Sequence, residues 1–379
     1  MRAACTRPKR VMLVFGTRPE AVKMAPIVRR MAEAPGLVPQ VCVTAQHRQM
    51  LDQVLDLFGI RPGHDLGIMR GAQGLTHVTT AVLERLPEVF AAARPDRVLV
   101  QGDTATTFAA ALAAFYARVP VGHVEAGLRT GNVHSPWPEE MNRKLTTGIA
   151  DLHFAPTGTS RANLLREGVD PARVHVTGNT GIDALLDAVA ILEAEPARAS
   201  ALDAALPRLD PARRLVLVTG HRRENCDGGL ERVARGVRRL ADRGDVEVVY
   251  PVHLNPVVQE AARAALDGHP RIHLAPPLDY LPFVSLMRRA HLIVTDSGGV
   301  QEEAPSLGKP VLVTRDTTER PEAVEAGTVE LVGTNTERLV ERAARLLDDP
   351  AAHAAMSFAH NPYGDGRAAA RIVEALLHE

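Results

Sequence analysis

The chain has few cysteines, almost no net charge and no long apolar run, and each shortage excludes a class of protein. Its three cysteines, Cys5, Cys42 and Cys226, are scattered and odd in number. They predict a reducing, cytoplasmic environment rather than a disulfide framework or a zinc knuckle. Forty-four Lys and Arg against 45 Asp and Glu leave a net charge of -1, which provides no basic excess for nucleic acid. No apolar run reaches the roughly 18 residues of a membrane-spanning helix, so no membrane partner is predicted.

Two further signals are missing. The start MRAACTRPKR is basic, but the apolar run VMLVFG after it is too short for a secretory signal, so we expect a flexible tail and then a first strand. The turn GTRPE does not match G-x-G-x-x-G, which gives no support for a tightly bound dinucleotide. No spacing of carboxylates and histidines is typical of a closed metal site. We therefore predict neither a cofactor nor a metal.

What the chain has is a regular alternation of short β-branched runs with Ala-, Leu- and Arg-rich amphipathic segments. This alternation predicts an α/β fold with parallel sheets covered by helices. The first series of expected strands covers 11–15, 39–43, 97–101, 119–124, 152–155 and 174–177. The second series covers 215–219, 246–251, 272–274, 292–295, 311–313 and 328–331. With 379 residues, 45% of them hydrophobic, the chain can bury two cores.

The two series imply two doubly wound domains with a cleft between them. An Ala-rich helical stretch after Asn179, reaching about Leu206, separates the series. We place the first domain at residues 1–185 and the second at 186–365. The final segment, 366–379, has helical periodicity, and we expect it to pack back on the first domain.

Acidic side chains follow the strands of the first domain, where open parallel sheets bind ligands. Asp103 follows the run VLVQ and Glu125 follows VGHV, whereas Glu139 and Glu140 follow a loop with the only tryptophan between two prolines. Helix capping could account for Asp103, and the helix dipole for Glu139 and Glu140. The functional alternative is a cluster of carboxylates whose pKa values are separated, giving one acid and one base at neutral pH.

Groups suited to anions follow other strands. Arg18 and Lys23 stand at the start of the first predicted helix, where they suit a phosphate or a carboxylate, although ordinary capping is an equal alternative. The segment Val294–Glu303 reads VTDSGGVQEE, a strand-to-helix turn. Ser297, Gly298 and Gly299 there would offer backbone N–H groups to an anion, or only form a glycine-rich turn with a capping serine. Glu303 lies one turn further and could reach hydroxyl groups.

The second domain adds further polar groups after its strands. In VTGHRREN, His221 would supply a proton donor near neutral pH, and the arginines beginning at Arg222 would bind anions. His253 is expected to be structural or peripheral. Phe283 is predicted to lie on a loop before a helix, where core packing and base stacking are equal alternatives. Arg320 could close on a sugar or a phosphate.

Seven motifs in this order resemble those of the non-hydrolysing bacterial UDP-N-acetylglucosamine 2-epimerases: GTRPEAVKMAP, QGDTATT, HVEAGLRT, SPWPEEMNR, TGHRREN, DSGGVQEEAPSLGKPVLV and TTERPE. The resemblance extends from Gly16 to Gly366. It implies two Rossmann-like domains of the GT-B type with the ligand in the interdomain cleft, and a homodimer. The implied activity is reversible interconversion of UDP-N-acetylglucosamine and UDP-N-acetylmannosamine without nicotinamide or metal.

The resemblance also implies roles for individual residues. Asp103, Glu125 and Glu139 match the catalytic carboxylates, without fixing which one removes the proton, and His221 matches a histidine that assists UDP departure. The implied contacts of the nucleotide and diphosphate are Arg18, Lys23, Leu278, Phe283, Ser297, Gly298, Gly299, Glu303 and Arg320. The implied site for an activating second substrate molecule contains Gln46, Gln49, Arg222 and His253. Ala72 stands where such relatives can carry an arginine, which leaves Arg70 as the candidate substitute.

Two other functions stay open from sequence. A hydrolysing 2-epimerase would let water trap an intermediate and release N-acetylmannosamine and UDP. A nucleotide-sugar-binding module would have no turnover, but binding a diphosphate gains nothing from three additional carboxylates.

Overall fold

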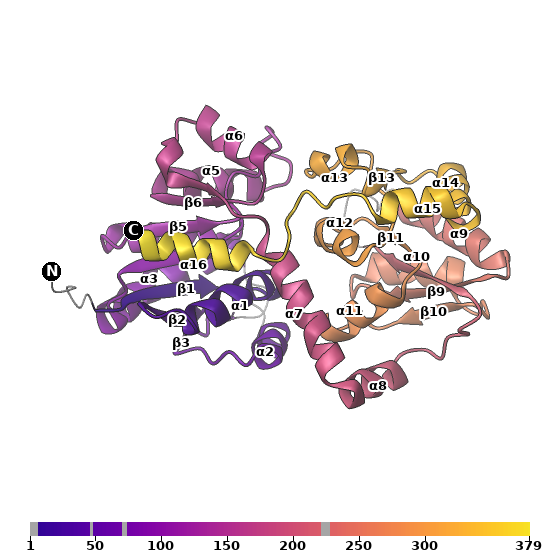
Figure 1. Cartoon of the computed structure of the whole chain (residues 1–379), viewed down its shortest axis with the longest axis horizontal. Helices are drawn as coiled ribbons and strands as arrows, with labels where there is room; N and C mark the ends of the chain where they lie inside the picture. Colours follow the sequence, from indigo (N-terminus) through magenta and orange to yellow (C-terminus); the bar gives the residue numbers. More distant parts are fainter. Residues whose placement is uncertain (1–6, 46–47, 70–73, 221–227) are drawn as a thin grey trace. The chain divides into compact units, whose positions relative to one another are not determined.

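The computed structural model describes residues 7–45, 48–69, 74–220 and 228–379, except for the side chain of Gln49 (Figure 1). The flexible tail was expected over residues 1–10. Residues 1–6 lie outside this part, whereas Lys9 and Arg10 belong to the first strand. The chain forms two compact units. Unit 1 contains the residues up to Ala184 together with Tyr363–Glu379, and unit 2 contains Leu185–Pro362. None of the helices in the described ranges is long and apolar enough to cross a membrane.

Unit 1 is built on a parallel sheet with the described strands in the order β3-β2-β1-β4-β5-β6-β7. The strands are β1 (Lys9–Phe15), β2 (Leu37–Val43), β3 (His64–Asp65), β4 (Arg97–Gln101), β5 (Val121–Val124), β6 (Leu152–Ala155) and β7 (Val174–Val176). The central strands are buried over most of their length, as the nearly continuous apolar runs predicted. The two-residue β3 is too short to give a periodic signal, and the sequence did not predict it.

Helices follow the strands and cover both faces of this sheet (Figure 1). They are α1 (Arg18–Ala32), α2 (Arg48–Leu57), α3 (Leu75–Ala93), α4 (Ala105–Tyr116), α5 (Glu139–Ile149), α6 (Gly158–Arg166), the short 3-10 helix η1 (Pro171–Arg173), the start of α7 (Thr180–Ala194), and α16 (Ala368–His378). The alanines of α4 are buried against α3 and the sheet because their small side chains let the helices approach closely.

The last helix belongs to unit 1. Helix α16 packs against α1, and the carboxylate of Asp183 in α7 accepts hydrogen bonds from the backbone N–H groups of Ala368 and Ala369 at 3.1 and 2.9 Å. These are N–H groups that a helix start leaves without partners of its own. Asp183 therefore caps α16 from another element.

Unit 2 contains a second parallel sheet, with the described strands in the order β10-β9-β8-β11-β12-β13. The strands are β8 (Arg214–Thr219), β9 (Val246–Pro251), β10 (Ile272–Ala275), β11 (Leu292–Thr295), β12 (Val311–Val313) and β13 (Val329–Leu331). The helices are α8 (Pro196–Ala205), α9 (Gly229–Asp242), α10 (Pro256–Leu266), α11 (Tyr280–Arg289), α12 (Gly298–Glu303), η3 (Ala304–Leu307), α13 (Pro321–Glu325), α14 (Thr336–Asp348) and α15 (Pro350–Ser357).

One expectation about the middle of the chain is wrong. The single helical stretch expected up to about Leu206 is two helices, α7 and α8, separated at Glu195. Glu195 precedes Pro196, and the ring of a proline disfavours helical geometry for the residue before it. Composition alone hides this break because alanine is abundant on both sides.

Candidate active site

Glu125 directly follows β5 and is held by donors from two other elements and from the loop before α7. Lys23 of α1 forms an ion pair with its carboxylate, Gln101 of β4 donates a hydrogen bond to Oε2, and Asn179 Nδ2 donates to Oε1 at 3.2 Å. The backbone of Glu125 has a φ of 65°, in the left-handed region. A residue of this size in that conformation costs about 1–3 kcal/mol, and such residues concentrate at functional sites. Lys23, predicted as a phosphate contact, thus lies against a carboxylate.

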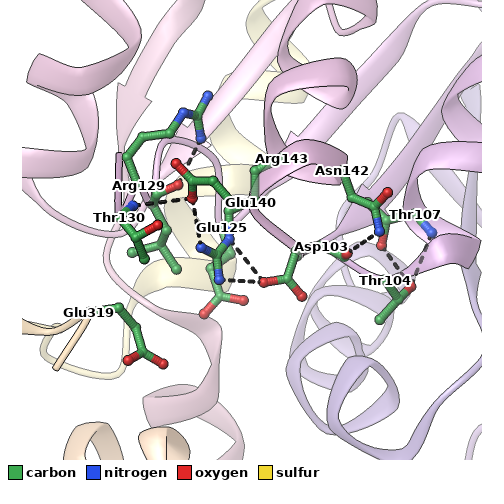
Figure 2. A network of polar contacts seen from close by, with 12 residues as sticks. Asp103, Thr104, Thr107, Glu125, Arg129, Thr130, Glu140, Asn142, Arg143 and Glu319 are labelled. Atoms are coloured by element: carbon green, nitrogen blue, oxygen red, sulfur yellow. Dashed lines mark hydrogen bonds and ion pairs between the residues drawn. The ribbon is translucent and has the colours of Figure 1, made fainter. Parts of the chain in front are cut away.

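Asp103 lies in the neighbouring turn, between β4 and α4, and is held by α5. Arg143 donates from Nε and Nη2 to Asp103 Oδ2 at 2.9 and 2.6 Å, and Asn142 Nδ2 donates to the Asp103 carbonyl at 2.8 Å (Figure 2). The capping alternative for Asp103 is wrong, because the helix cap is Thr104, whose side chain accepts from the N–H of Thr107. The Asp103 side chain therefore has another task.

The Asp103 and Glu125 turns are adjacent in space. They follow neighbouring strands, and a Cβ on Gly102 would lie 3.6 Å from Glu125 Oε2. Gly102 has a φ of 75°, which a side chain would strain. The backbone conformation of the turn, rather than lack of space, therefore requires glycine here.

The two glutamates at the start of α5 differ in their surroundings. Glu140 is completely buried and accepts hydrogen bonds from the backbone N–H groups of Thr130 and Gly131 and from Arg143, each at 3.1 Å. Glu139 has a buried Oε2 that accepts no hydrogen bond from any described residue. An unpaired buried carboxylate oxygen costs free energy, which makes it a candidate for contact with a ligand. The sequence interpretation did not separate Glu140 from Glu139, and it did not single out Arg143.

Glu20 is a third missed residue. It is buried at the start of α1, and its carboxylate accepts from the backbone N–H groups of Gly16 and Thr17 and from the hydroxyl groups of Thr104 and Thr107. Burial raises the pKa of Glu20, against the lowering effect of the hydrogen bonds from Thr104 and Thr17. Glu20 ties the turn after β1 to the turn that carries Asp103. Its sequence signal was the capping box formed with Thr17.

In unit 2, the predicted glycine turn forms the start of α12, and the guanidinium group of Arg320 packs against it. Ser297 occupies the cap position without a side-chain cap hydrogen bond. Arg320 is held by Glu302 and Glu319, at 2.7 Å from each. A Cβ on Gly298 would lie 2.5 Å from Arg320 Nη1, so this glycine is required for the close approach of the guanidinium group.

Other predicted contacts are distributed around this unit. The expectation that Phe283 lies on a loop is wrong, because Phe283 is half-buried within α11 and its N–H donates to the Asp279 carbonyl. Pro282 lies in the first turn of this helix, where a proline removes no helical hydrogen bond. Leu278 precedes the helix and is half-buried, as is Glu303 at the end of α12. His253 is exposed, and its Nδ1 accepts from the N–H of Asn255.

Some predicted residues lie outside the described residues. They are His221, Arg222, Gln46, Arg70 and Ala72, and the side chain of Gln49 is likewise outside. Of the four residues predicted for a second substrate molecule, only His253 has a described side chain. Within the described ranges, no group of three or more His, Cys, Asp or Glu side chains is arranged to hold a metal ion.

Comparisons with known proteins identify the family of this chain. Residues 29–377 match the family model described as UDP-N-acetylglucosamine 2-epimerase. The chain is 58% identical over 369 residues to a probable UDP-N-acetylglucosamine 2-epimerase of Ralstonia solanacearum, covering 97% of this chain and 98% of that protein. It is 57% identical over 368 residues to the Escherichia coli K12 UDP-N-acetylglucosamine 2-epimerase, again covering 97% and 98%.

Solved structures give the same result. The Neisseria meningitidis UDP-GlcNAc 2-epimerase bound to UDP-GlcNAc has a TM-score of 0.93 and 49% identity, covering 98% of this chain and 100% of that one. The Methanocaldococcus jannaschii enzyme in complex with UDP-GlcNAc and UDP has a TM-score of 0.83 and 33% identity, covering 98% and 100%. The predicted fold class, α/β with two Rossmann-like domains of the GT-B type, is confirmed. The chain therefore belongs to the UDP-N-acetylglucosamine 2-epimerase family.

Proposed function

We propose that the chain catalyses the reversible epimerisation of UDP-N-acetylglucosamine to UDP-N-acetylmannosamine at carbon 2. The route is elimination of UDP, formation of a glycal and re-addition of UDP. The observation that carries the proposal is the adjacent placement of Asp103 and Glu125 at the carboxyl ends of β4 and β5. Family membership and the relatives with UDP-GlcNAc bound support the choice of substrate.

The chemistry explains why carboxylates are needed. The proton on carbon 2 is not next to a carbonyl group, so its direct removal is very costly. If its loss is coupled to the departure of UDP from carbon 1, the product is a neutral alkene. Protonation from the other face with re-addition of UDP then inverts carbon 2. An acid and a base must flank the sugar, and both fragments must be retained until they recombine.

We assign the proton transfers to unit 1. Asp103 and Glu139 each have a carboxylate oxygen without a hydrogen bond from the described residues, which suits them to exchange protons with a ligand. Glu125 is enclosed by donors, with the charge of Lys23 beside it, and we propose that it acts on the sugar from this fixed position. His221 is proposed to assist the departure of UDP.

We assign UDP binding to groups of unit 2 and to one arginine of unit 1. The backbone of the turn that starts α12 would bind the diphosphate, with Arg320 held behind it by Glu302 and Glu319. The proposed contacts of UDP are Arg18, Leu278, Phe283, Ser297, Gly298, Gly299, Glu303 and Arg320. The proposed site for a second substrate molecule contains Gln46, Gln49, Arg222 and His253. Cys42 is a buried free thiol, in keeping with the cytoplasmic location that we propose for an enzyme of nucleotide sugars.

Proton spectra of the sugar in deuterated water test the proposed function. We expect both UDP-linked epimers to form from UDP-N-acetylglucosamine, each with deuterium at carbon 2. Free reducing sugar with UDP would instead establish the hydrolysing reaction. Binding without any turnover would establish a nucleotide-sugar-binding module.

A further inference from the structure

A buried ion pair within α5 lies behind Asp103. Figure 2 shows Arg143 between two carboxylates, with Asp103 on one side and Glu140 on the other. The side chains of Arg143 and Glu140 are 7% and 0% exposed. A buried cation shared by two acids from different segments fixes the distance between those segments.

The contacts form a continuous series from a loop to Asp103. The backbone N–H groups of Thr130 and Gly131 bind the two oxygens of Glu140, Glu140 binds Arg143 Nη1, and Arg143 binds Asp103 through Nε and Nη2. The guanidinium group is rigid and planar, so its orientation at Glu140 determines where its other edge meets Asp103.

The guanidinium group engages one oxygen of Asp103. Both hydrogen bonds from Arg143 reach Oδ2, at 2.9 and 2.6 Å, whereas Oδ1 accepts none from the residues that the structure describes. The Asp103 carbonyl is fixed by Asn142, so the turn as well as the side chain is held by α5. Oδ1 is thereby the oxygen left for a ligand.

We propose that Arg143 and Glu140 are positioning residues for the epimerisation. They hold Asp103 with Oδ2 bound and Oδ1 presented to the substrate, and Glu140 limits how strongly the charge of Arg143 acts on Asp103. This inference rests on the proposed function, because it assumes that Asp103 exchanges a proton with the sugar. It adds two residues that do not themselves touch the substrate.

The proposal predicts opposite electrostatic effects for two variants. Arg143→Gln removes the cation beside Asp103, whereas Glu140→Gln removes the acid that neutralises this cation. The limb of the pH–rate profile that reports Asp103 should move to higher pH in Arg143→Gln and to lower pH in Glu140→Gln, by about one pH unit each. The other titratable groups around the two turns stay unchanged in both variants: Glu20, Lys23, His123, Glu125, Arg129 and Glu139.

The experiment measures kcat and kcat/KM against pH for the full chain and the variants Glu140→Gln, Arg143→Gln and Arg143→Lys. We expect Glu140→Gln and Arg143→Gln to lose at least about tenfold in kcat, with KM and UDP affinity changed by less than about threefold. Arg143→Lys should restore the position of the limb but only part of kcat, because an ammonium group lacks the fork of donors.

The control is Asp151→Asn, since Asp151 also pairs with a largely buried arginine of unit 1, Arg97, at 2.6 Å, at the opposite ends of the strands. It should lower thermal stability without moving the pH profile. Limbs that stay in place, or move in the same direction in both Gln variants, would overturn the inference. If Arg143→Gln does not fold, Glu140→Gln and Arg143→Lys carry the same test. Absence of turnover in the unaltered chain would instead contradict the proposed function.

Discussion

The three proposed catalytic carboxylates differ in what surrounds their oxygen atoms. Glu125 is enclosed by Lys23, Gln101 and Asn179, Asp103 is bound through one oxygen, and Glu139 has a buried oxygen without a donor among the described residues. Carboxylate oxygens without a protein donor can meet a ligand, whereas oxygens enclosed by donors are held in place. We propose that these differences suit the three carboxylates to separate tasks in the reaction.

The first prediction concerns these carboxylates. Asp103→Asn and Glu125→Gln should each lose at least roughly 10²-fold in turnover, which is the usual effect of removing an acid or a base. Both should still bind UDP, because the proposed UDP contacts are other residues. Steady-state rates and calorimetric titration with UDP measure the two effects. Asp96→Asn, at the opposite end of β4, is the matched control and should keep full turnover; comparable turnover in Asp103→Asn would remove Asp103 from the mechanism.

The second prediction concerns adjacent glycines. A Cβ on Gly298 would lie within 2.8 Å of three atoms of the Arg320 guanidinium group, whereas one on Gly299 meets nothing within 4 Å. Gly298→Ala should therefore displace Arg320 from Glu302 and Glu319 and lower the free energy of unfolding by roughly 1–3 kcal/mol. Gly299→Ala should leave it nearly unchanged. Denaturant titration of the two variants decides the point; equal stability would mean that Arg320 moves aside without loss.

Sequence identified the carboxylates at this scale but not their partners. Asp103, Glu125 and Glu139 stand directly after strands or at a helix start, so pattern alone places them. Arg143 meets Asp103 across 40 positions of the chain, and such pairings leave no local signal. The helix dipole accounts equally for Glu139 and Glu140, and only burial in the folded chain separates the two.

At the scale of elements, neighbouring strands β5 and β6 each carry a buried histidine. The residues His123 and His153 are paired in register. Burial lowers the pKa of His123 to about 3, against a hydrogen bond to the Gly102 carbonyl, and lowers the pKa of His153 to about 4. Both imidazoles are therefore neutral in the folded protein at ordinary pH.

The third prediction follows from the sign of these shifts. The unfolded chain binds protons at both histidines below about pH 6.5, while the folded chain does not until the pH nears 4. The two neutral histidines therefore contribute fully to the free energy of unfolding above pH 6.5. This contribution is lost as the pH falls, at up to about 1.4 kcal/mol per pH unit for each histidine. The melting temperature should fall as the pH is lowered from 7.5 to 4.5. In the His153→Gln variant the melting temperature should fall less steeply over the same range. A melting temperature independent of pH in this window would refute the assignment.

The strand pattern was predictable because buried parallel strands are continuous apolar runs, and β4, β6, β9, β11 and β12 have the expected bounds. The remaining errors have local causes. The two residues of β3 are too few to form a pattern, and Pro196 interrupts an otherwise uniform alanine-rich stretch. Helix α11 begins three residues before Phe283 and includes Pro282 in its first turn. Turn chemistry competes with periodicity at each of these places.

At the scale of the whole molecule, we propose the homodimer that the resemblance implies. The chain has few aromatic residues, yet Phe115 and Tyr116 stand together at the end of α4, 59% and 70% exposed, with ring centroids 6.3 Å apart. Adjacent exposed rings of this kind are typical of association surfaces. We propose that they lie in the interface between two copies.

The fourth prediction tests this surface. Light scattering coupled to size-exclusion chromatography should give the mass of two chains, and the double variant Phe115→Glu and Tyr116→Glu should give the mass of one. Phe358→Glu is the matched control, because Phe358 is 87% exposed in unit 2 and should leave the mass unchanged. A double variant that remains dimeric would place the interface elsewhere.

The packing of α16 on unit 1 affects the order in which the two units can fold during synthesis. Unit 1 requires residues 363–379, which the ribosome adds only after all of unit 2 has been synthesised. Until then α1 lacks its neighbouring helix and leaves apolar surface uncovered, while every residue of unit 2 is already available. During translation the second half of the chain can therefore reach its native state before the first, and the nascent first half is the part that needs protection from aggregation.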